Sequence, residues 1–174
     1  EQYQRTLALP SKKSRQPLAT YLEAEEVHAI IDQPDRHTAL GQRDHGLLLF
    51  LYNTGARISE ALAVRCADLH LTPPRQVRLH GKGRKDRLCP LWPETTQALQ
   101  CLPAVRNNTP GNFIFVNRQG EPLTRDGVAY LLRKYVTAAI PTAPTLQRRK
   151  ITPHVLRHSC AVALLQSGVD ITVI

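Results

Sequence analysis

Residues 43–52 read RDHGLLLFLY, and this stretch decides the fold class. Its apolar side chains fall on nearly every side of a helical wheel, which is typical of a helix buried all round rather than of a surface helix. Gly55 follows after two polar residues, and glycine suits the left-handed turn that ends many helices. The sequence therefore predicts a buried central helix that ends before Gly55, with the other elements packed around it.

The segments on both sides of this helix are expected to be mainly helical. Helical periodicity or helix-start signals mark residues 21–32, 57–65, 92–102, 124–139 and 152–167. Short alternating or apolar runs mark strands at residues 77–80, 87–91 and 112–117, and residues 81–86 connect the first two as a hairpin. We expect an α+β fold that is mainly α, with a small antiparallel three-stranded sheet.

The composition favours a polyanionic partner. The chain has 174 residues with 23 Lys and Arg against 14 Asp and Glu, which gives a net charge of +9. A positive field of this kind attracts nucleic acid, although a basic protein with no nucleic-acid role has the same composition. Charge alone leaves both interpretations open.

The remaining bulk features favour a cytoplasmic protein without a membrane span. The longest apolar run, residues 46–52, is far shorter than the roughly 20 residues a spanning helix needs. The cysteines show no C-x-x-C spacing, so we expect reduced thiols rather than disulfides or zinc ligands. They are Cys66, Cys89, Cys101 and Cys160. Residues 1–20 are polar and basic and are interpreted as a linker, and the absence of Met indicates part of a longer gene product.

The first stretch with chemical potential is TGARISEAL, residues 54–62. Arg57 follows a tight glycine turn at a helix start, where free backbone N–H groups and the helix dipole favour an anion such as phosphate. Glu60, one turn later, is placed to hold the guanidinium. The alternative is a surface ion pair between these two residues, worth about 0.3 kcal/mol.

The second stretch is HGKGRKDR, residues 80–87. It lacks the G-x-x-x-x-G-K-[ST] spacing and lies between strands, so it is not a nucleotide-binding P-loop. It is interpreted as a hairpin whose Lys82 can enter a groove. The alternative is a charged turn that keeps a strand pair soluble.

The third stretch is TPHVLRH, residues 152–158. Thr152 as N-cap and the proline after it mark a helix start, and His154 and Arg157 project from one side of its first turn. A zinc pair of His154 and His158 is disfavoured because Val155 stands where the H-E-x-x-H pattern has glutamate. His158 is expected to pack against the apolar face.

In this order the three stretches resemble the catalytic domain of the tyrosine recombinases, the phage integrase family. The similarity continues through LLQSGVD at residues 164–170, and the intervening elements fit the family's layout from about residue 20 onward. The resemblance implies the fold of DNA breaking-rejoining enzymes and site-specific recombination of double-stranded DNA. It implies a nucleoid-associated protein that works as a tetramer on paired DNA sites.

The resemblance also implies roles for particular residues. Arg57 and Arg157 would bind the non-bridging oxygens of the scissile phosphate, with Glu60 in support. Lys82 would protonate the departing 5′-oxygen, and His154 would assist proton transfer. A tyrosine would attack phosphorus to form a 3′-phosphotyrosyl link, a reaction that needs no metal and no cofactor. Candidates for DNA-backbone contacts are Arg84, Lys85, Arg148, Arg149 and Lys150; for the last three, a solvated charge run is an equal alternative.

The sequence departs from the family pattern in more than one respect. The attacking tyrosine should follow Arg157, but no tyrosine follows Tyr135. Tyr52, Tyr130 and Tyr135 precede Arg157 and have apolar neighbours, so they are expected to pack. We therefore expect a catalytic domain (residues 21–174) that is incomplete at its C-terminus, lacks its nucleophile and the family's N-terminal DNA-binding domain, and is an inactive monomer alone. Alternatives are a non-catalytic DNA-binding relative, a type IB topoisomerase fragment or a basic structural or RNA-binding protein.

Overall fold

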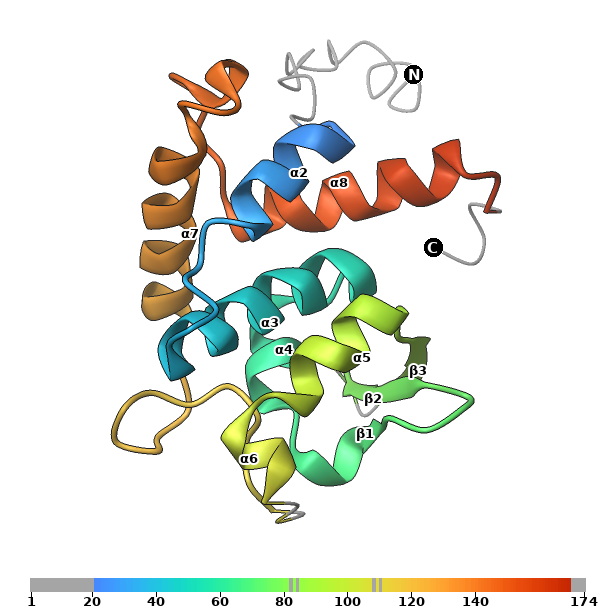
Figure 1. Cartoon of the computed structure of the whole chain (residues 1–174). Helices are drawn as coiled ribbons and strands as arrows, with labels where there is room; N and C mark the ends of the chain where they lie inside the picture. Colours follow the sequence, from blue (N-terminus) through green and yellow to red (C-terminus); the bar gives the residue numbers. More distant parts are fainter. Residues whose placement is uncertain (1–20, 82, 84, 108, 110, 170–174) are drawn as a thin grey trace, which may run out of the picture.

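The computed structural model describes residues 21–81, 83, 85–107, 109 and 111–169. The expected linker at residues 1–20 lies outside this part, as do Lys82 and Arg84. Figure 1 shows a mainly helical chain with one small sheet at its lower right. Within the described residues, no helix combines the length and the apolar character that crossing a membrane requires.

The predicted central helix is present as α3 (Ala39–Thr54), longer at its start than the apolar run alone indicated. The Thr38 side chain accepts a hydrogen bond from the Gly41 N–H at 3.0 Å, which caps the helix start. Gly55 ends the helix in the left-handed conformation, with φ of 55°, and its N–H bonds to the carbonyl of Leu51. The predicted glycine turn is therefore confirmed.

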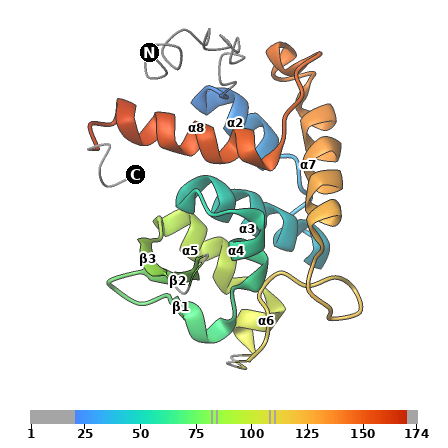
Figure 2. The ribbon, with the colours of Figure 1, turned by 180° about the vertical axis from the view of Figure 1, so that it is seen from behind.

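Helix α3 lies between two hydrophobic clusters. Leu47, Phe50 and Leu51 pack into a lower cluster with α4 (Ile58–Ala63), α5 (Pro93–Gln100) and the sheet. Leu48, Leu49 and Tyr52 pack into an upper cluster with α2 (Ala24–Ile31), α7 (Arg125–Ala139) and α8 (Pro153–Gln166). Both views place α8 beside α2 and α7 at one side of this upper layer (Figures 1 and 2). Burial on both faces explains why residues 43–52 show no polar side.

The sheet has the order β1-β2-β3 and is antiparallel throughout. Strands β2 (Gln76–His80) and β3 (Asp86–Pro90) form the predicted hairpin, with His80 opposite Asp86. The third strand is β1 (Leu69–His70), which pairs with the start of β2. Short helical turns, η2 (Cys66–Asp68) and α6 (Pro103–Arg106), lie on either side of these strands in the sequence.

The prediction of a strand at residues 112–117 is wrong. This segment makes only isolated bridges, Arg65 to Phe113 and Val116 to Pro122. Adjacent residues Ile114 and Phe115 are both buried, which the alternating faces of a half-buried strand do not allow. The backbone instead bonds in turn to the segment after α4 and to the segment before α7. Apolar side chains thus gave this buried loop the composition of a strand.

Two further expectations about helices and side chains have clear outcomes. Helix α7 is followed by a turn, η3 (Pro144–Leu146), and α8 begins with Thr152 at the N-cap position and Pro153 at its first residue, as predicted.

Tyr52 and Tyr135 are buried as expected, but Tyr130 is 62% exposed, so its predicted packing is wrong. Tyr130 lies on the face of α7 that turns away from the buried stripe.

Candidate functional site

Arg57 stands at the N-cap of α4, directly after the turn at Gly55. Its extended backbone lets the side chain leave the helix start, and that side chain is 61% exposed. Its Nη1 donates a hydrogen bond to Glu60 Oε1 at 2.9 Å, and its backbone N–H donates to Glu60 Oε2 at 3.0 Å. The guanidinium is therefore held at its base and open to solvent on its other side.

The Glu60 carboxylate is nearly buried, with 4% of its side chain exposed. It accepts a further hydrogen bond, at 2.8 Å, from Nη2 of Arg87 on β3. Burial alone would raise the pKa of Glu60, but hydrogen bonds from Arg87 and Arg57 outweigh burial and lower it to about 2. The ionised Glu60 carboxylate thus connects Arg57 at the start of α4 to the hairpin strand β3. No local sequence pattern singles out Arg87.

Arg157 reaches the same place from α8. Its Nη1 donates a hydrogen bond to the backbone carbonyl of Gly55. Burial lowers the pKa of Arg157, and the nearby charges of Arg57 and Arg87 lower it further. Added at Gly55, a Cβ would lie 3.4 Å from Cys160 Sγ and 4.0 Å from Arg157 Cγ, so the turn packs closely on α8. The structure therefore brings the two predicted arginines together from segments about 100 residues apart.

Two adjoining surface hollows define the space around these arginines. The first, named here the α4–α8 hollow, has a volume of about 410 Å³, and its lining includes Arg57, Arg125, Thr152, His154 and Arg157. The second, named here the hairpin hollow, has a volume of about 460 Å³ and is lined by Arg57, Ser59, Glu60, His80, Gly81 and Arg125. Because Arg57 and Arg125 line both, they stand at the junction.

Arg125 is a site residue that sequence reasoning missed. It is the first residue of α7, after Thr124, whose side chain accepts a hydrogen bond from the Gly127 N–H at 3.0 Å. The sequence signal was a basic residue directly after the helix N-cap Thr124. His154, on α8, is exposed and lines the α4–α8 hollow together with Arg125. His158, also on α8, is partly buried.

The hairpin begins at the edge of the hairpin hollow. Lys82 and Arg84 lie outside the described residues, and Lys85 is exposed. The Gly81 N–H bonds to the Lys85 carbonyl at 3.0 Å, which closes the base of the hairpin. At that base, His80 Nε2 lies 2.9 Å from Asp68 Oδ1 and His80 Nδ1 lies 3.0 Å from Asp86 Oδ1. Hydrogen bonds to these two carboxylates raise the pKa of His80.

The basic loop before α8 divides into different environments. Arg149 is engaged internally: its Nη1 donates to both carboxylate oxygens of Glu26, at 2.6 and 2.8 Å. Arg148 is exposed and has a left-handed backbone, with φ of 66°. Lys150 is exposed and lines a third hollow of about 350 Å³ together with Arg133. Of the three predicted DNA-backbone candidates here, Arg148 and Lys150 present their charge to solvent.

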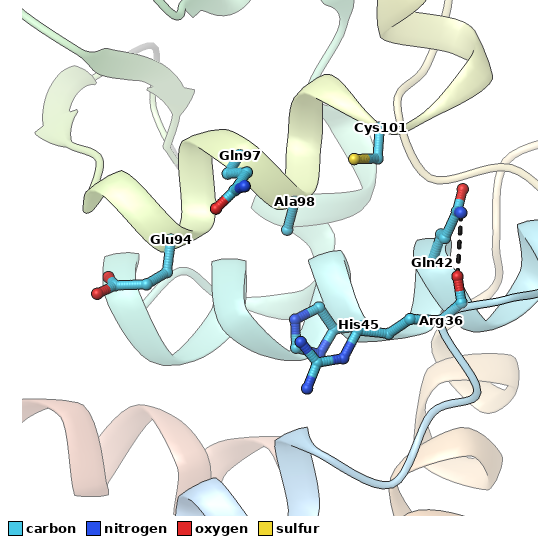
Figure 3. A pocket seen from close by; sticks show the side chains of 7 residues that line it. All are labelled: Arg36, Gln42, His45, Glu94, Gln97, Ala98 and Cys101. Atoms are coloured by element: carbon cyan, nitrogen blue, oxygen red, sulfur yellow. Dashed lines mark hydrogen bonds between the residues drawn. The ribbon is translucent and has the colours of Figure 1, made fainter.

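A hollow of about 310 Å³ on another face has a different character (Figure 3). It lies between α3 and α5, and its lining combines Arg36 and His45 with Glu94, two glutamines and Cys101. The Gln42 amide donates to the Arg36 carbonyl at 3.0 Å. Burial lowers the pKa of His45, whose Nδ1 lies 2.8 Å from the Ile31 carbonyl oxygen. None of the predicted site residues lines this hollow.

The residues around Arg57 can bind a phosphate group. Arg57, Arg125 and Arg157 line one hollow from the start of α4, from α7 and from α8. Arg is the side chain best shaped for bidentate contact with phosphate oxygens. Within the described residues, no three His, Cys, Asp or Glu side chains cluster in a way that could hold a metal ion.

Comparison with known proteins identifies relatives of the whole described chain. The model of the Phage integrase family matches residues 20–174. A Sinorhizobium fredii (strain NGR234) protein with the provisional name integrase/recombinase y4rC is 39% identical over 173 residues, or 99% of this chain and 52% of that protein. The tyrosine recombinase XerC of Bacillus licheniformis is 37% identical over 172 residues, or 95% of this chain and 54% of that protein. The chain thus spans about half the length of the curated relatives it matches.

Solved structures share the fold. The XerH site-specific recombinase bound to its palindromic difH substrate, in a post-cleavage complex, superposes with a TM-score of 0.77 at 27% identity. That match covers 93% of this chain and 46% of the XerH chain. The XerA recombinase superposes with a TM-score of 0.73 at 23% identity, over 90% of this chain and 54% of that one.

Proposed function

Because the chain belongs to the phage integrase family, we propose that it forms the phosphate-binding part of a tyrosine recombinase, which cuts and rejoins double-stranded DNA at specific sites. The observation that carries the proposal is the approach of Arg57, Arg157 and His154 to one hollow of about 410 Å³. The XerH relative was solved with a DNA substrate, which supports duplex DNA as the partner of this chain too.

In the proposed reaction the two arginines neutralise the charge that develops on the scissile phosphate. Arg57 and Arg157 each contact a non-bridging oxygen, and catalysis comes mainly from this positioning and charge stabilisation. A tyrosine oxygen forms a bond to phosphorus as the bond from phosphorus to the 5′-oxygen breaks. Lys82 donates a proton to the departing oxygen, and His154 assists proton transfer at the phosphate. The 3′-phosphotyrosyl bond conserves the energy needed for rejoining.

We infer that the tyrosine of this reaction is none of Tyr52, Tyr130 and Tyr135. Tyr52 and Tyr135 are buried, and Tyr135 donates its hydroxyl proton to Asp44 at 2.6 Å. Tyr130 is exposed on α7 but does not line either hollow beside Arg57. Because the nucleophile is expected after Arg157 and no tyrosine follows Tyr135, we assign the nucleophile to a tyrosine outside these 174 residues. We assign residues 1–20 to a linker toward a separate DNA-binding part.

The test uses the full-length product of the gene that encodes this sequence. It is incubated with a library of nicked duplexes with randomised central sequence, on which cleavage traps the protein on the DNA. The expected result is a complex that resists detergent and disappears on proteolysis. Arg57→Ala and Arg157→Ala should each slow its formation by about 10²–10³-fold.

The control is Arg36→Ala, which removes an exposed arginine that pairs with Asp32 far from the site. It should leave the rate within about twofold of wild type, since surface ion pairs contribute little. If the wild-type protein forms no covalent complex, or if Arg57→Ala forms it at the wild-type rate, the proposed function is wrong.

A further inference from the structure

The Glu60 carboxylate joins two parts of the site that the chain keeps separate. Oε1 accepts from the Arg57 side chain, and Oε2 accepts from both the Arg57 backbone N–H and the Arg87 side chain. All three contacts lie between 2.8 and 3.0 Å. A buried carboxylate with donors on both oxygens has a fixed orientation, because rotating it would leave donors and acceptors unpaired.

Arg87 is the only one of these groups that comes from the sheet. It lies on β3, opposite Leu79 of β2, on the strand that returns from the hairpin. Its side chain is 39% exposed, but it lines neither the α4–α8 hollow nor the hairpin hollow. Arg87 is therefore placed to act on Glu60 rather than on a bound phosphate.

We propose that Arg87 is a positioning residue for DNA cleavage: it fixes the Glu60 carboxylate, which in turn holds the Arg57 guanidinium toward the scissile phosphate. This inference rests on the proposed function. Arg57 needs such positioning because its side chain is long and mostly exposed. Its described side-chain hydrogen bond is the one to Glu60. A misplacement of about 1 Å in a group of this kind can cost about 10²-fold in rate.

Arg87 could also affect the reaction by a different route, through the hairpin. Its hydrogen bond to Glu60 ties β3 to α4, and β3 continues from the hairpin that carries Lys82. A substrate with sulfur in place of the bridging 5′-oxygen separates the two routes, because a thiolate leaves without a general acid. A rate defect caused by misplaced Lys82 would therefore disappear with this substrate. A rate defect caused by misplaced Arg57 would remain.

The experiment measures single-turnover cleavage by the full-length gene product, with DNA affinity measured separately. Arg87→Ala is expected to slow cleavage by about 10–100-fold, with affinity for DNA within about threefold of wild type and an equal loss on the sulfur-containing substrate. Arg87→Lys should recover part of the rate, because lysine supplies one donor without the planar fork of arginine. In an Arg57→Ala background, Arg87→Ala should add little, since residues that act as a unit are not additive.

The matched control is Arg78→Ala, which removes an exposed arginine from the neighbouring strand β2. It should cleave as wild type does. Thermal melting of each variant establishes whether it is folded at the assay temperature. If Arg87→Ala is unfolded at that temperature, Arg87→Lys is used in its place.

Three results would overturn the inference while the wild-type protein still cleaves DNA. They are a wild-type rate for Arg87→Ala, recovery of that variant on the sulfur-containing substrate, and a loss of DNA affinity as large as the loss of rate. If the wild-type protein itself fails to cleave, the proposed function fails first and the inference falls with it.

Discussion

The Arg157 guanidinium donates a hydrogen bond to the backbone carbonyl of Gly55, the left-handed residue that ends α3 and precedes Arg57 by two positions. One turn of backbone thus orients both arginines: it sends Arg57 outward from the start of α4 and supplies the acceptor that holds Arg157. The geometry of the proposed phosphate site therefore depends on this turn as well as on the charged side chains.

Replacing Gly55 tests that dependence. Gly55→Ala places a Cβ at a φ of 55° and 3.4 Å from Cys160 Sγ, so it should destabilise the fold by about 1–2 kcal/mol and weaken DNA binding. Gly120→Ala is the control, because Gly120 also has a positive φ, of 83°, but nothing lies within 4 Å of its Cβ position. Urea unfolding and fluorescence anisotropy measure the two effects. Equal DNA affinities in the two variants would contradict the role of the turn.

Acid should weaken the fold through Glu60. Its folded pKa of about 2 lies below the ordinary 4.5, so the ionised carboxylate stabilises the protein above pH 4.5 and this contribution is lost as the pH falls toward 2. Glu60→Gln should cost roughly 2–3 kcal/mol near neutral pH and progressively less below pH 4.5. Urea unfolding across this range measures the difference, with the exposed Glu121→Gln as control. A pH-independent cost would show that Glu60 does not act as an anion.

His80 should remain protonated above its ordinary pKa of 6.5. Hydrogen bonds between its two ring nitrogens and the carboxylates of Asp68 and Asp86 raise its pKa, and the smaller effect of burial opposes them. Its stabilising contribution is therefore complete below pH 6.5 and is lost as the pH rises through the folded value.

An NMR titration of the His80 ring protons measures this pKa directly. Asp68→Asn should shift the midpoint downward, because it removes the first of the two carboxylates. A His80 midpoint at or below 6.5 would show that the two contacts do not hold the imidazolium in solution.

Neighbouring arginines of the basic loop should behave differently. Arg149→Ala leaves the buried Glu26 carboxylate without its ion-pair partner, so it should cost about 2 kcal/mol of stability. Arg148→Ala should change stability by less than about 0.5 kcal/mol and lower the slope of log affinity against log salt by about 1. Urea unfolding measures the stability of both variants, and DNA binding between about 50 and 200 mM salt measures their salt slopes. The assignment is wrong if Arg149→Ala changes only the salt slope.

Lys82→Ala in the full-length product tests the general acid proposed from the sequence. Cleavage of ordinary DNA should slow by about 10²–10⁴-fold, whereas DNA with a bridging sulfur at the cut should react at nearly the wild-type rate. Lys134→Ala is the control, because Lys134 is an exposed lysine of α7 that lines neither hollow beside Arg57. Equal slowing on both substrates would rule out Lys82 as the acid.

Sequence reasoning predicted the elements whose signals are local. The apolar run before Gly55, the cap and proline before α8 and the β2–β3 hairpin each have a pattern that a single stretch determines, and the structure confirms them. The segment at residues 112–117 failed because its burial comes from tertiary packing, which can make a loop as apolar as a strand.

The site residues found only in the structure were missed for a related reason. Arg87 and Arg125 have no distinctive pattern in their own segments. Arg87 is singled out by its hydrogen bond to Glu60, and Arg125 by lining the same hollow as Arg57; both partners are distant in sequence. Arg149 shows the reverse: it has the same local sequence signal as Arg148, but a contact with Glu26 more than 120 residues away engages it internally. Long-range pairing of this kind leaves no periodic signal in one sequence.

The position of α3 between two hydrophobic clusters has a consequence for motion. Its side chains belong to both clusters, so neither layer can separate without exposing the other, and the two should open as one cooperative unit. Amide protons in the middle of α3 should therefore exchange with deuterium only through global unfolding, among the slowest in the chain. The carbonyl that holds Arg157 and the turn that orients Arg57 lie at the C-terminal end of this helix.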